Sequence, residues 1–563
     1  MGGFVRKTGV RYQVQGARWW FFLVVLFLAA CATKPIEPAP VTGGKPRLVL
    51  FLVVDGLPQR QVVEYWDQLA PDGFRRFLDR GAWFPEAYYG HAATLTGPGH
   101  ATMLTGAYPH RTGIIANEWR DAATGEPEYC AGDTTAVYIG HKTSKLDGTS
   151  PKNLKVESLG DVLRKGDARS KVIGISGKDR GAILPAGKMG VAYMYQSQTG
   201  QFASTTYYMK QHPKWVADFH AKNPADAYFH KEWRPLLADS AYARSLPDEQ
   251  KWYAKGGKLP KTMGEGIDKP SPLYYGSLLP SPFGDDLTLA FARAAIAGES
   301  LGKDDAPDIL IVSLSSHDYI NHAYGAESRI SHDHVLQLDR MLQDFFGDVD
   351  LMVGKDNYLA VLTADHGFMP APEYSQRLGR DAGRVNAGQM IAKVNAALAK
   401  QFGEGQWALG MSGQSVLLNH KLIAEKNVSA PAIEEEARKV LLAEPGVEVV
   451  YTREELEKGG KANAPLFEQM RKAWNRDVSG DLQVGLKPYW MYGSASNMTT
   501  HGSPHPYDTN VPILFYGPSW VRPGRIDTRV EVVDIAPTLA RILAVPAPAA
   551  CEGKPLPLEA PGR

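Results

Sequence analysis

The sequence predicts an α/β fold with a central, mostly parallel sheet and helices on both faces. Two observations carry this prediction. Short continuous apolar runs, typical of strands buried on both faces, alternate with segments whose apolar residues recur at helical spacing. Polar residues able to perform chemistry follow or adjoin these runs, as they do at the strand ends that form the site edge of an open α/β sheet.

Five apolar runs are predicted as strands. In chain order they are Leu48–Val54, Lys171–Ile175, Ile309–Leu314, Leu359–Thr363 and Val511–Tyr516. The first ends in Asp55-Gly56, the pattern of a central parallel strand that meets a turn. Helices are predicted at Gln59–Arg80 and Ser331–Phe346, because their apolar residues share one helical face.

Two long stretches interrupt this alternation and are predicted as insertions. Residues 190–282 are dense in Tyr, Trp, Lys and Pro with little strand periodicity, which indicates an inserted cap or, alternatively, a long surface loop. Residues 381–489 combine helical and strand patterns, which indicates a second, α+β insertion. Its predicted helices and strands are Gln389–Phe402, Ala430–Ala443, Gln414–Leu418 and Val447–Tyr451.

The first 46 residues are expected to lie outside the folded domain. A basic segment without acidic residues precedes the short apolar run Trp19–Leu28, and Leu28-Ala29-Ala30-Cys31 resembles a bacterial lipobox. We therefore expect a lipoprotein signal peptide (1–31) with Cys31 lipidated; a plain secretory signal is the alternative. Ala32 after the cysteine favours the periplasmic face of the outer membrane. Residues 32–46 are expected to form a flexible tether.

Composition limits the remaining possibilities. The chain has 563 residues, with 62 Lys and Arg against 61 Asp and Glu, so nothing points to nucleic acid as a partner. A catalytic domain is expected over 47–550, with a C-terminal tail at 551–563. Cys130 and Cys551 could form a disulfide in an exported protein or remain free thiols, and their sequence context does not decide which.

Candidate metal ligands fall in four segments. Asp318 and His322 are four residues apart, which places both on one side of a helical turn. Asp365 and His366 follow a predicted strand, and His501 lies in a polar loop where His505 competes for the same role. Each of these features also has an interpretation without a metal. Asp318 and His322 could be a solvated pair, Asp365 and His366 could belong to a turn that ends a strand, and His501 could be an ordinary loop histidine. Together with Asp55, their oxygen and nitrogen atoms suit two catalytic zinc sites of three protein ligands each.

Thr96 is the candidate nucleophile. It precedes Gly97-Pro98, and a proline there suits a helix start, where backbone N–H groups can bind a phosphoryl oxygen. A role as helix N-cap is the alternative, and Thr94 is a rival nucleophile. Lys178 and Arg180 follow a predicted strand and would face the same way if extended. They are either two cations for a phosphate group or a solvated basic turn.

On these residues the chain resembles the alkaline phosphatase superfamily, and more narrowly the phosphate-irrepressible alkaline phosphatases related to nucleotide pyrophosphatase/phosphodiesterases. The resemblance implies an alkaline-phosphatase-like fold with Thr96 as nucleophile and Asn117 as a phosphoryl-binding residue. It implies one zinc held by Asp318, His322 and His501, and a second held by Asp55, Asp365, His366 and the Thr96 oxygen. It also implies that Lys178 and Arg180 distinguish monoesterases from diesterase relatives, and that Lys178 replaces a third catalytic metal.

The sequence therefore predicts a lipid-anchored enzyme that uses two Zn²⁺ ions to hydrolyse small phosphate monoesters through a phosphothreonine intermediate. One alternative is a phosphodiesterase or nucleotide pyrophosphatase with the same metals. Another is a catalytically silent, zinc-binding surface lipoprotein, which would have no need of the nucleophile. Physiological substrate and oligomeric state are not predicted.

Overall fold

The structure is a computed structural model that describes residues 44–494 and 497–561. The predicted signal peptide with Cys31, and the tether up to residue 43, lie outside the described residues. The described residues belong to one compact unit. Among them, no helix combines the length and the apolar character that crossing a membrane requires.

The core is a sheet of nine strands within the described residues. From edge to edge these are β20 (Gly524–Arg525), β2 (Ala82–Phe84), β19 (Ile513–Tyr516), β12 (Tyr358–Thr363), β1 (Leu48–Val54), β11 (Asp308–Leu314), β6 (Val172–Ser176), β7 (Val191–Gln196) and β8 (Gln201–Ala203). The strands β12, β1, β11, β6 and β7 are parallel neighbours. The predicted mostly parallel α/β sheet is confirmed.

The register of the central strands places their carboxyl ends at one edge. Val54 of β1 pairs with Leu314 of β11, and Val53 pairs with Thr363 of β12. Strand β19 runs antiparallel to β12 and begins at Ile513, opposite Thr363. Because β19 is reversed, the loop that precedes it reaches the same edge as the segments that follow its parallel neighbours.

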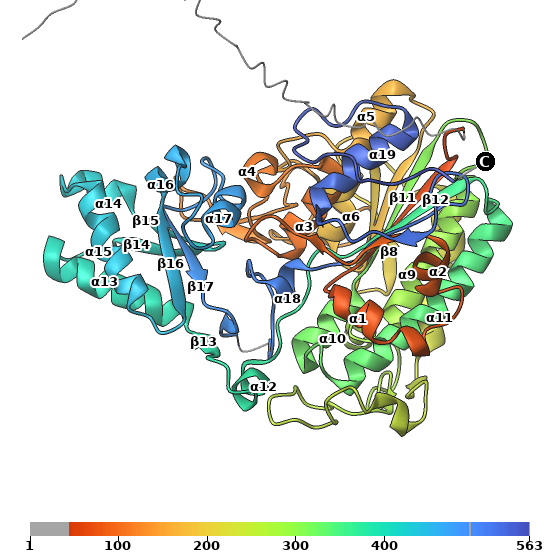
Figure 1. Cartoon of the computed structure of the whole chain (residues 1–563), viewed down its shortest axis with the longest axis horizontal. Coiled ribbons are helices and arrows are strands. Elements are labelled where there is room, and N and C mark those ends of the chain that lie inside the picture. The colour runs from red at the N-terminus through yellow and green to blue at the C-terminus, as the bar shows by residue number, and fades with distance from the viewer. Residues whose placement is uncertain (1–43, 495–496, 562–563) are drawn as a thin grey trace, which may run out of the picture. The chain divides into compact units, whose positions relative to one another are not determined.

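Helices cover both faces of this sheet (Figure 1). On one face, α9 (Pro282–Gly298) contacts β6 and β11 and packs against α11 (Arg329–Met352). On the other, α6 (Asp179–Ala186) contacts β6, β7 and β11 and packs against α3 (Thr96–Thr105), which contacts α19 (Ile535–Leu543). Every residue of β1 is fully buried between the layers, which explains its unbroken apolar run.

Smaller elements complete this layer structure. They are β3 (Ala87–Tyr88), α4 (Pro109–Thr112), β4 (Glu118–Arg120), β5 (Pro127–Tyr129), α5 (Leu159–Gly166), α10 (Ser316–Tyr324), α12 (Pro372–Arg377), α18 (Pro506–Thr509) and β21 (Val530–Glu531).

The helix predicted over Gln59–Arg80 is wrong as one continuous element. The segment forms α1 (Gln59–Glu64), a 3₁₀ turn at Trp66–Gln68 and α2 (Arg75–Arg80). The buried carboxylate of Asp339 accepts hydrogen bonds from the backbone N–H groups of Ala70 (2.6 Å) and Phe74 (2.8 Å), and so holds the connecting turn. By contrast, the helix predicted at Ser331–Phe346 lies within the longer α11, whose N-terminus is capped by the Ser328 hydroxyl.

The stretch predicted as a cap, 190–282, does not leave the sheet at residue 190. Its first residues form β7, which pairs in parallel with β6, and then the edge strand β8. The sequence does not predict strand β7, because its buried residues include Tyr193, Met194 and Tyr195 and do not form an aliphatic run. The rest contains α7 (Lys214–His220), β9 (Glu232–Trp233), β10 (Lys261–Thr262), α8 (Pro272–Leu278) and 3₁₀ turns at Pro224–Tyr228 and Asp239–Tyr242.

Residues 381–489 contain a separate four-stranded antiparallel sheet with helices against it (Figure 1). The elements are β14 (Ala408–Ser412), β15 (Ser415–Leu418), β17 (Leu482–Leu486), β16 (Val447–Thr452), α13 (Ala387–Phe402), α14 (His420–Glu425), α15 (Ala430–Leu442), α16 (Arg453–Lys458) and α17 (Phe467–Ala473). It has its own buried core, which includes Met390, Val394, Ile433 and Val484. A parallel pair, β13 (Gly383–Val385) and β18 (Trp490–Tyr492), connects it to the rest of the chain.

The segment predicted as a C-terminal tail packs on the main domain as far as residue 561. Leu556 and Leu558 are buried in the main core, and the Leu556 N–H donates to the Thr538 hydroxyl of α19 (2.8 Å). Cys130 and Cys551 are both free thiols. Of the two alternatives for Cys130 and Cys551, the structure therefore shows free thiols and no disulfide between them.

Candidate active site

The candidate site lies at the edge where the central parallel strands end. Asp55 directly follows β1, Asp318 lies on α10 just after β11, and Asp365 follows β12. Gly56 turns the chain after Asp55 with a φ of 73°, a conformation that glycine adopts at little cost. Its N–H donates to Asp365 Oδ1 (3.0 Å), so two strand ends are fixed against each other.

Asp318, His322 and His501 form the first ligand group. Asp318 Oδ1 lies 3.4 Å from His322 Nε2 and 3.5 Å from His501 Nε2. Asp318 and His322 meet because α10 places residues four apart on one side. His501 comes from the loop before β19, and its distant position in the sequence is explained by the reversed direction of that strand.

Asp55, Asp365 and His366 form the second ligand group. His366 Nε2 lies 3.5 Å from Asp55 Oδ1 and 3.4 Å from Asp365 Oδ2. The two groups adjoin, because the His366 and His501 rings are stacked with centroids 3.4 Å apart and His366 Nε2 is 4.0 Å from Asp318 Oδ1.

Backbone carbonyls orient the three histidines. In each ring Nδ1 lies within hydrogen-bond distance of a carbonyl oxygen, so a proton on Nδ1 leaves the Nε2 lone pair free to bind a metal. The pairs are His322 with Thr499 (2.9 Å), His366 with Gly367 (2.9 Å) and His501 with Thr94 (2.8 Å).

Several polar side-chain atoms of these two groups lack a hydrogen-bond partner in the protein. Among the described residues, Asp55 Oδ1, Asp318 Oδ1, Asp365 Oδ2 and His366 Nε2 are buried without a hydrogen-bond partner. Burial, with the Asp365 carboxylate nearby, raises the pKa of Asp55 well above its usual value. Buried carboxylates and imidazoles that converge without partners are what a pair of divalent cations would satisfy, so the residues present fit a two-metal site.

Thr96 is the first residue of α3, and its helix packs closely against the second ligand group. A Cβ on Gly99 would lie 2.2 Å from the Asp365 carbonyl oxygen, so only glycine permits this approach. The alternative of Thr96 as N-cap is wrong, because Leu95 occupies that position and makes no side-chain cap. The rival Thr94 donates its hydroxyl proton to the Ser503 carbonyl (2.7 Å).

Lys178 and Arg180 both reach the site, although only Lys178 has an extended backbone. Lys178 is the N-cap residue of α6 and Arg180 lies in its first turn. Lys178 Nζ lies 2.8 Å from Asp55 Oδ2 and 2.5 Å from Asp318 Oδ2, and so bridges the two ligand groups. Burial disfavours its charge, but these two carboxylates outweigh that and hold the pKa of Lys178 above its usual value.

Arg180 and Asn117 adjoin the Thr96 end of the site. Arg180 Nη2 donates to Thr96 Oγ1 at 3.4 Å. Asn117 Oδ1 accepts from the Gly97 N–H (2.7 Å), an arrangement that leaves the Asn117 amide N–H groups free to bind another acceptor. The remaining rival, His505, is directed away, because its Nε2 lies 2.9 Å from the Leu486 carbonyl oxygen of the insertion.

Sequence analysis assigned no role to three further residues at this site. Tyr319, next to Asp318, places its ring 4.9 Å from Lys178 Nζ. The Tyr129 hydroxyl accepts from Arg180 Nη1 (3.1 Å). His100 lies one turn after Thr96, with Nδ1 2.9 Å from the Thr96 carbonyl and 3.3 Å from Asp365 Oδ2. Helical spacing from Thr96 could have indicated His100, whereas no local pattern marks Tyr129.

At the strand-end edge of the sheet, two adjoining groups of oxygen and nitrogen ligands lie next to a hydroxyl at a helix start, and the cations Lys178 and Arg180 lie beside them. This arrangement is that of a metal-dependent hydrolase. Comparison with known proteins agrees with this class. Residues 49–508 match the model of the type I phosphodiesterase / nucleotide pyrophosphatase family. The chain therefore belongs to that family, and the predicted resemblance is confirmed.

Similar proteins place the chain among alkaline phosphatases. It is 32% identical over 517 residues to the alkaline phosphatase PafA of Elizabethkingia meningoseptica, covering 91% of this chain and 94% of PafA. It is 34% identical over 522 residues, with the same coverage, to a Myroides odoratus protein named a calcium-transporting ATPase. The PafA crystal structure superposes with a TM-score of 0.85 at 32% identity, covering 91% of this chain and 98% of PafA.

A PafA variant substituted at one Thr, one Asn, one Lys and one Arg also matches, with a TM-score of 0.84 and the same coverage. These matches confirm the alkaline-phosphatase-like fold and the prediction of an enzyme of the alkaline phosphatase type that hydrolyses phosphoesters.

Proposed function

We propose that this protein hydrolyses phosphate monoesters through a covalent phosphothreonine at Thr96, with two zinc ions as cofactors. The observation that carries the proposal is the arrangement of Lys178 and Arg180. One cation bridges the two ligand groups and the other contacts the Thr96 hydroxyl. A site that concentrates positive charge beside a nucleophile suits the doubly charged phosphoryl group of a monoester.

The two ligand groups would each hold one metal. Asp318, His322 and His501 would bind the first; Asp55, Asp365 and His366 would bind the second, next to Thr96. Mixed carboxylate and imidazole ligands favour zinc, although other divalent ions also accept such ligands. Bound metals supply positive charge that lowers the pKa of a nearby hydroxyl and offsets the charge that develops in the transition state.

The chain's own residues would perform the remaining steps. The Thr96 hydroxyl gives up its proton to solvent, and its Oγ attacks phosphorus. The bond from Oγ to phosphorus forms as the bond to the leaving oxygen breaks, and the leaving oxygen takes up a proton from solvent to depart as an alcohol. Water then attacks the phosphothreonine, which releases inorganic phosphate and restores the Thr96 hydroxyl. Two inversions give net retention at phosphorus. Asn117 and Arg180 would donate hydrogen bonds to phosphoryl oxygens in both steps.

Lys178 supports two further parts of the proposal. Its ammonium lies between Asp55 and Asp318, where it neutralises carboxylates that would otherwise suit another cation, so we expect no third catalytic metal. The four residue types substituted in the PafA variant recur here as Thr96, Asn117, Lys178 and Arg180, with the same separations within each pair. That correspondence supports a shared role for the four residues.

A phosphodiesterase with the same metals is the second candidate, and the name of the matching family model favours it. A diester phosphoryl group carries one negative charge, so it gains less from two cations than a monoester does. The catalytically silent alternative gains no support, because it would give the Thr96 hydroxyl and the cations beside it no task.

We also propose that the enzyme is anchored by lipid on Cys31 at the periplasmic face of the outer membrane. The support is the lipobox-like Leu28-Ala29-Ala30-Cys31. Metabolic labelling with a radioactive fatty acid, for the full chain and for Cys31→Ser, tests this. Equal labelling of both proteins, or none of the wild type, would contradict the anchor.

The direct test of the covalent step is to trap it. The zinc-loaded enzyme is mixed with a phosphomonoester, quenched in acid, digested and examined by mass spectrometry for phosphate on Thr96. Thr96→Ala should lose both the adduct and turnover, by about 10³-fold or more, whereas Thr96→Ser retains a hydroxyl and should keep both at a reduced level. Full turnover by Thr96→Ala would sink the proposal.

A further inference from the structure

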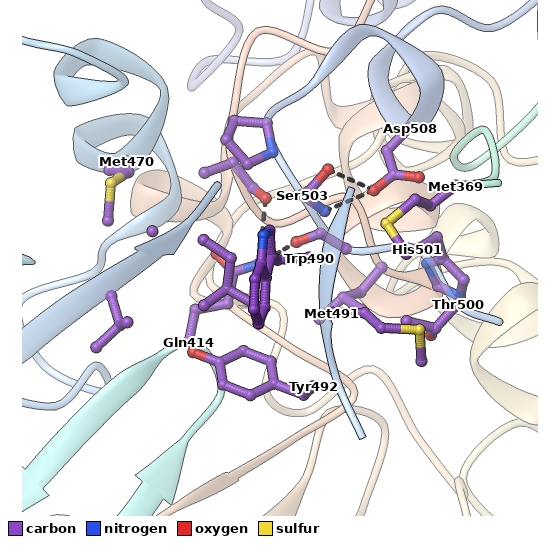
Figure 2. Close-up of a pocket in the computed structure, with 17 residues that line it drawn as sticks. Met369, Gln414, Met470, Trp490, Met491, Tyr492, Thr500, His501, Ser503 and Asp508 are labelled. Carbon is purple, nitrogen blue, oxygen red and sulfur yellow. Dashed lines mark hydrogen bonds between the residues drawn. The ribbon is translucent and has the colours of Figure 1, made fainter. Parts of the chain in front are cut away.

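An apolar cavity adjoins the first ligand group, between the main domain and the α+β insertion. Its volume is about 220 Å³. The main domain contributes Leu95, Met369 and the loop Thr500–Pro504, and the insertion side contributes Met470, Leu486 and Trp490–Tyr492. Figure 2 shows the Trp490 and Tyr492 rings in the middle of the view, with Met369, Thr500 and His501 on the right.

The walls of the cavity connect it to the chemistry. His501, a member of the first ligand group, lines it directly. Leu95, which immediately precedes the nucleophile Thr96, lines it as well, and its side chain faces Gly502, where an added Cβ would lie 2.9 Å from Leu95 Cδ2. Gln414 of the insertion donates hydrogen bonds to the carbonyls of Gly502 and Ala92, and so ties the insertion to this wall.

Two of the residues that line the cavity have polar atoms whose partners the protein does not supply. Among the described residues, Asp508 Oδ1 and the Tyr492 hydroxyl are buried without a hydrogen-bond partner, and both residues line the cavity. Burial disfavours the charged carboxylate of Asp508 and raises its pKa to about 7. Buried polar atoms in proteins normally have partners, so these two indicate an occupant or ordered water.

We infer that this cavity binds the apolar part of the leaving group, so that the preferred substrates are monoesters of aromatic or branched alkyl alcohols. The inference rests on the proposed function. An in-line attack by Thr96 puts the leaving oxygen on the opposite side of phosphorus from Thr96. The inference assigns that side to the first ligand group, whose His501 forms part of the cavity wall. The methionines Met369, Met470 and Met491 have flexible apolar side chains that can adapt to occupants of different shape.

The test is a series of 4-alkylphenyl phosphates on the zinc-loaded enzyme. Lengthening the alkyl chain scarcely changes the reactivity of the phenol leaving group, so it isolates the effect of apolar contact. We expect kcat/KM to rise about fourfold for each methylene that the cavity accommodates, and then to level off. Methyl phosphate serves as the reference substrate with no apolar part to bind.

Three variants locate the effect. Met491→Gln and Met470→Gln each place an amide in the cavity at nearly constant volume and should reduce the gain per methylene to less than twofold. Met411→Gln, in β14 of the same insertion and away from the cavity, is the matched control and should keep the wild-type gain. Because two lining residues are tested, misfolding of one variant does not remove the test.

Each outcome distinguishes the two claims. A flat series in a wild-type enzyme that hydrolyses methyl phosphate overturns the cavity's role and leaves the phosphomonoesterase proposal intact. A rising series that both cavity variants retain places the contact elsewhere and also overturns the inference. Hydrolysis of diesters without any monoester overturns both claims.

Discussion

The two ligand groups of the site differ in how far they are removed from solvent. Asp55, Asp365 and His366 have side chains with no exposed surface, whereas the His322 side chain of the other group is 17% exposed. The buried group is built from residues that directly follow two central strands. The more exposed group combines a helix, α10, with the loop before β19 and adjoins the apolar cavity.

This difference suggests a division of labour. The buried group lies beside Thr96, the proposed nucleophile, where a low dielectric strengthens the electrostatic effect of every charge on its hydroxyl. The exposed group faces the side on which we place the leaving group, where substrate must enter and alcohol must depart. Substitutions should therefore cost more in the buried group than in the exposed one.

Replacing one ligand in each group is expected to give the largest contrast. Asp365→Asn keeps an oxygen for the Gly56 N–H but removes a buried negative charge, so kcat/KM for a monoester should fall about 10³-fold or more. His322→Gln should cost about 10²-fold. The measurement is steady-state kinetics in saturating zinc, with metal content determined by atomic emission. Equal losses, or a greater loss for His322→Gln, would refute the division.

Removing each cation should weaken the preference for monoesters over diesters. Arg180→Ala and Lys178→Ala should each lower kcat/KM for monoesters about 10²-fold and lower it for diesters much less, because a monoester carries one more negative charge. Arg180 contacts Thr96 and Tyr129, so Arg180→Ala should keep its zinc. Lys178 also bridges the two ligand groups, so its zinc content must be measured alongside. Equal losses on both substrate types would remove the specificity role.

Graded chelation should show a smaller effect. Zinc should leave the more exposed group first, so activity is lost before thermal stability. Release from the buried group should then lower Tm, because it leaves buried carboxylates without their cation and removes a ligand that stabilises the folded state. Calorimetry and activity, followed together against zinc per chain, check this order. A single step in which both change in parallel would mean that the groups lose metal together.

Sequence patterns were sufficient to predict the central strands of the core and the polar residues at the edge of the sheet. Strands such as β1 are aliphatic over their whole length because they are buried on both faces, and that pattern is visible without a structure. Strand β7, which lies near the sheet edge and includes tyrosines, does not show it. The break between α1 and α2 depends on a hydrogen bond to Asp339, far away in the sequence.

The candidate site shows the same limit: residues paired by local geometry could be predicted from the sequence, whereas contacts between distant segments could not. Asp318 and His322 could be paired from their spacing, and Asp365 and His366 from their adjacency, because local geometry fixes both. The contact of Lys178 with two distant carboxylates, and the contact of Tyr129 with Arg180, form only when separate segments meet. The cavity beside His501 could not be predicted for the same reason, since its walls come from two parts of the fold.

The measurement that tests the central claim most directly is paired kinetics on p-nitrophenyl phosphate and bis-p-nitrophenyl phosphate with the zinc-loaded enzyme. Both substrates release the same alcohol, but the diester carries one negative charge fewer and a second nitrophenyl group in place of a phosphoryl oxygen. The two cations at the site, Lys178 and Arg180, predict a kcat/KM at least about 10²-fold higher for the monoester. A preference for the diester would contradict the account, because it would leave Lys178 and Arg180 without the role proposed for them.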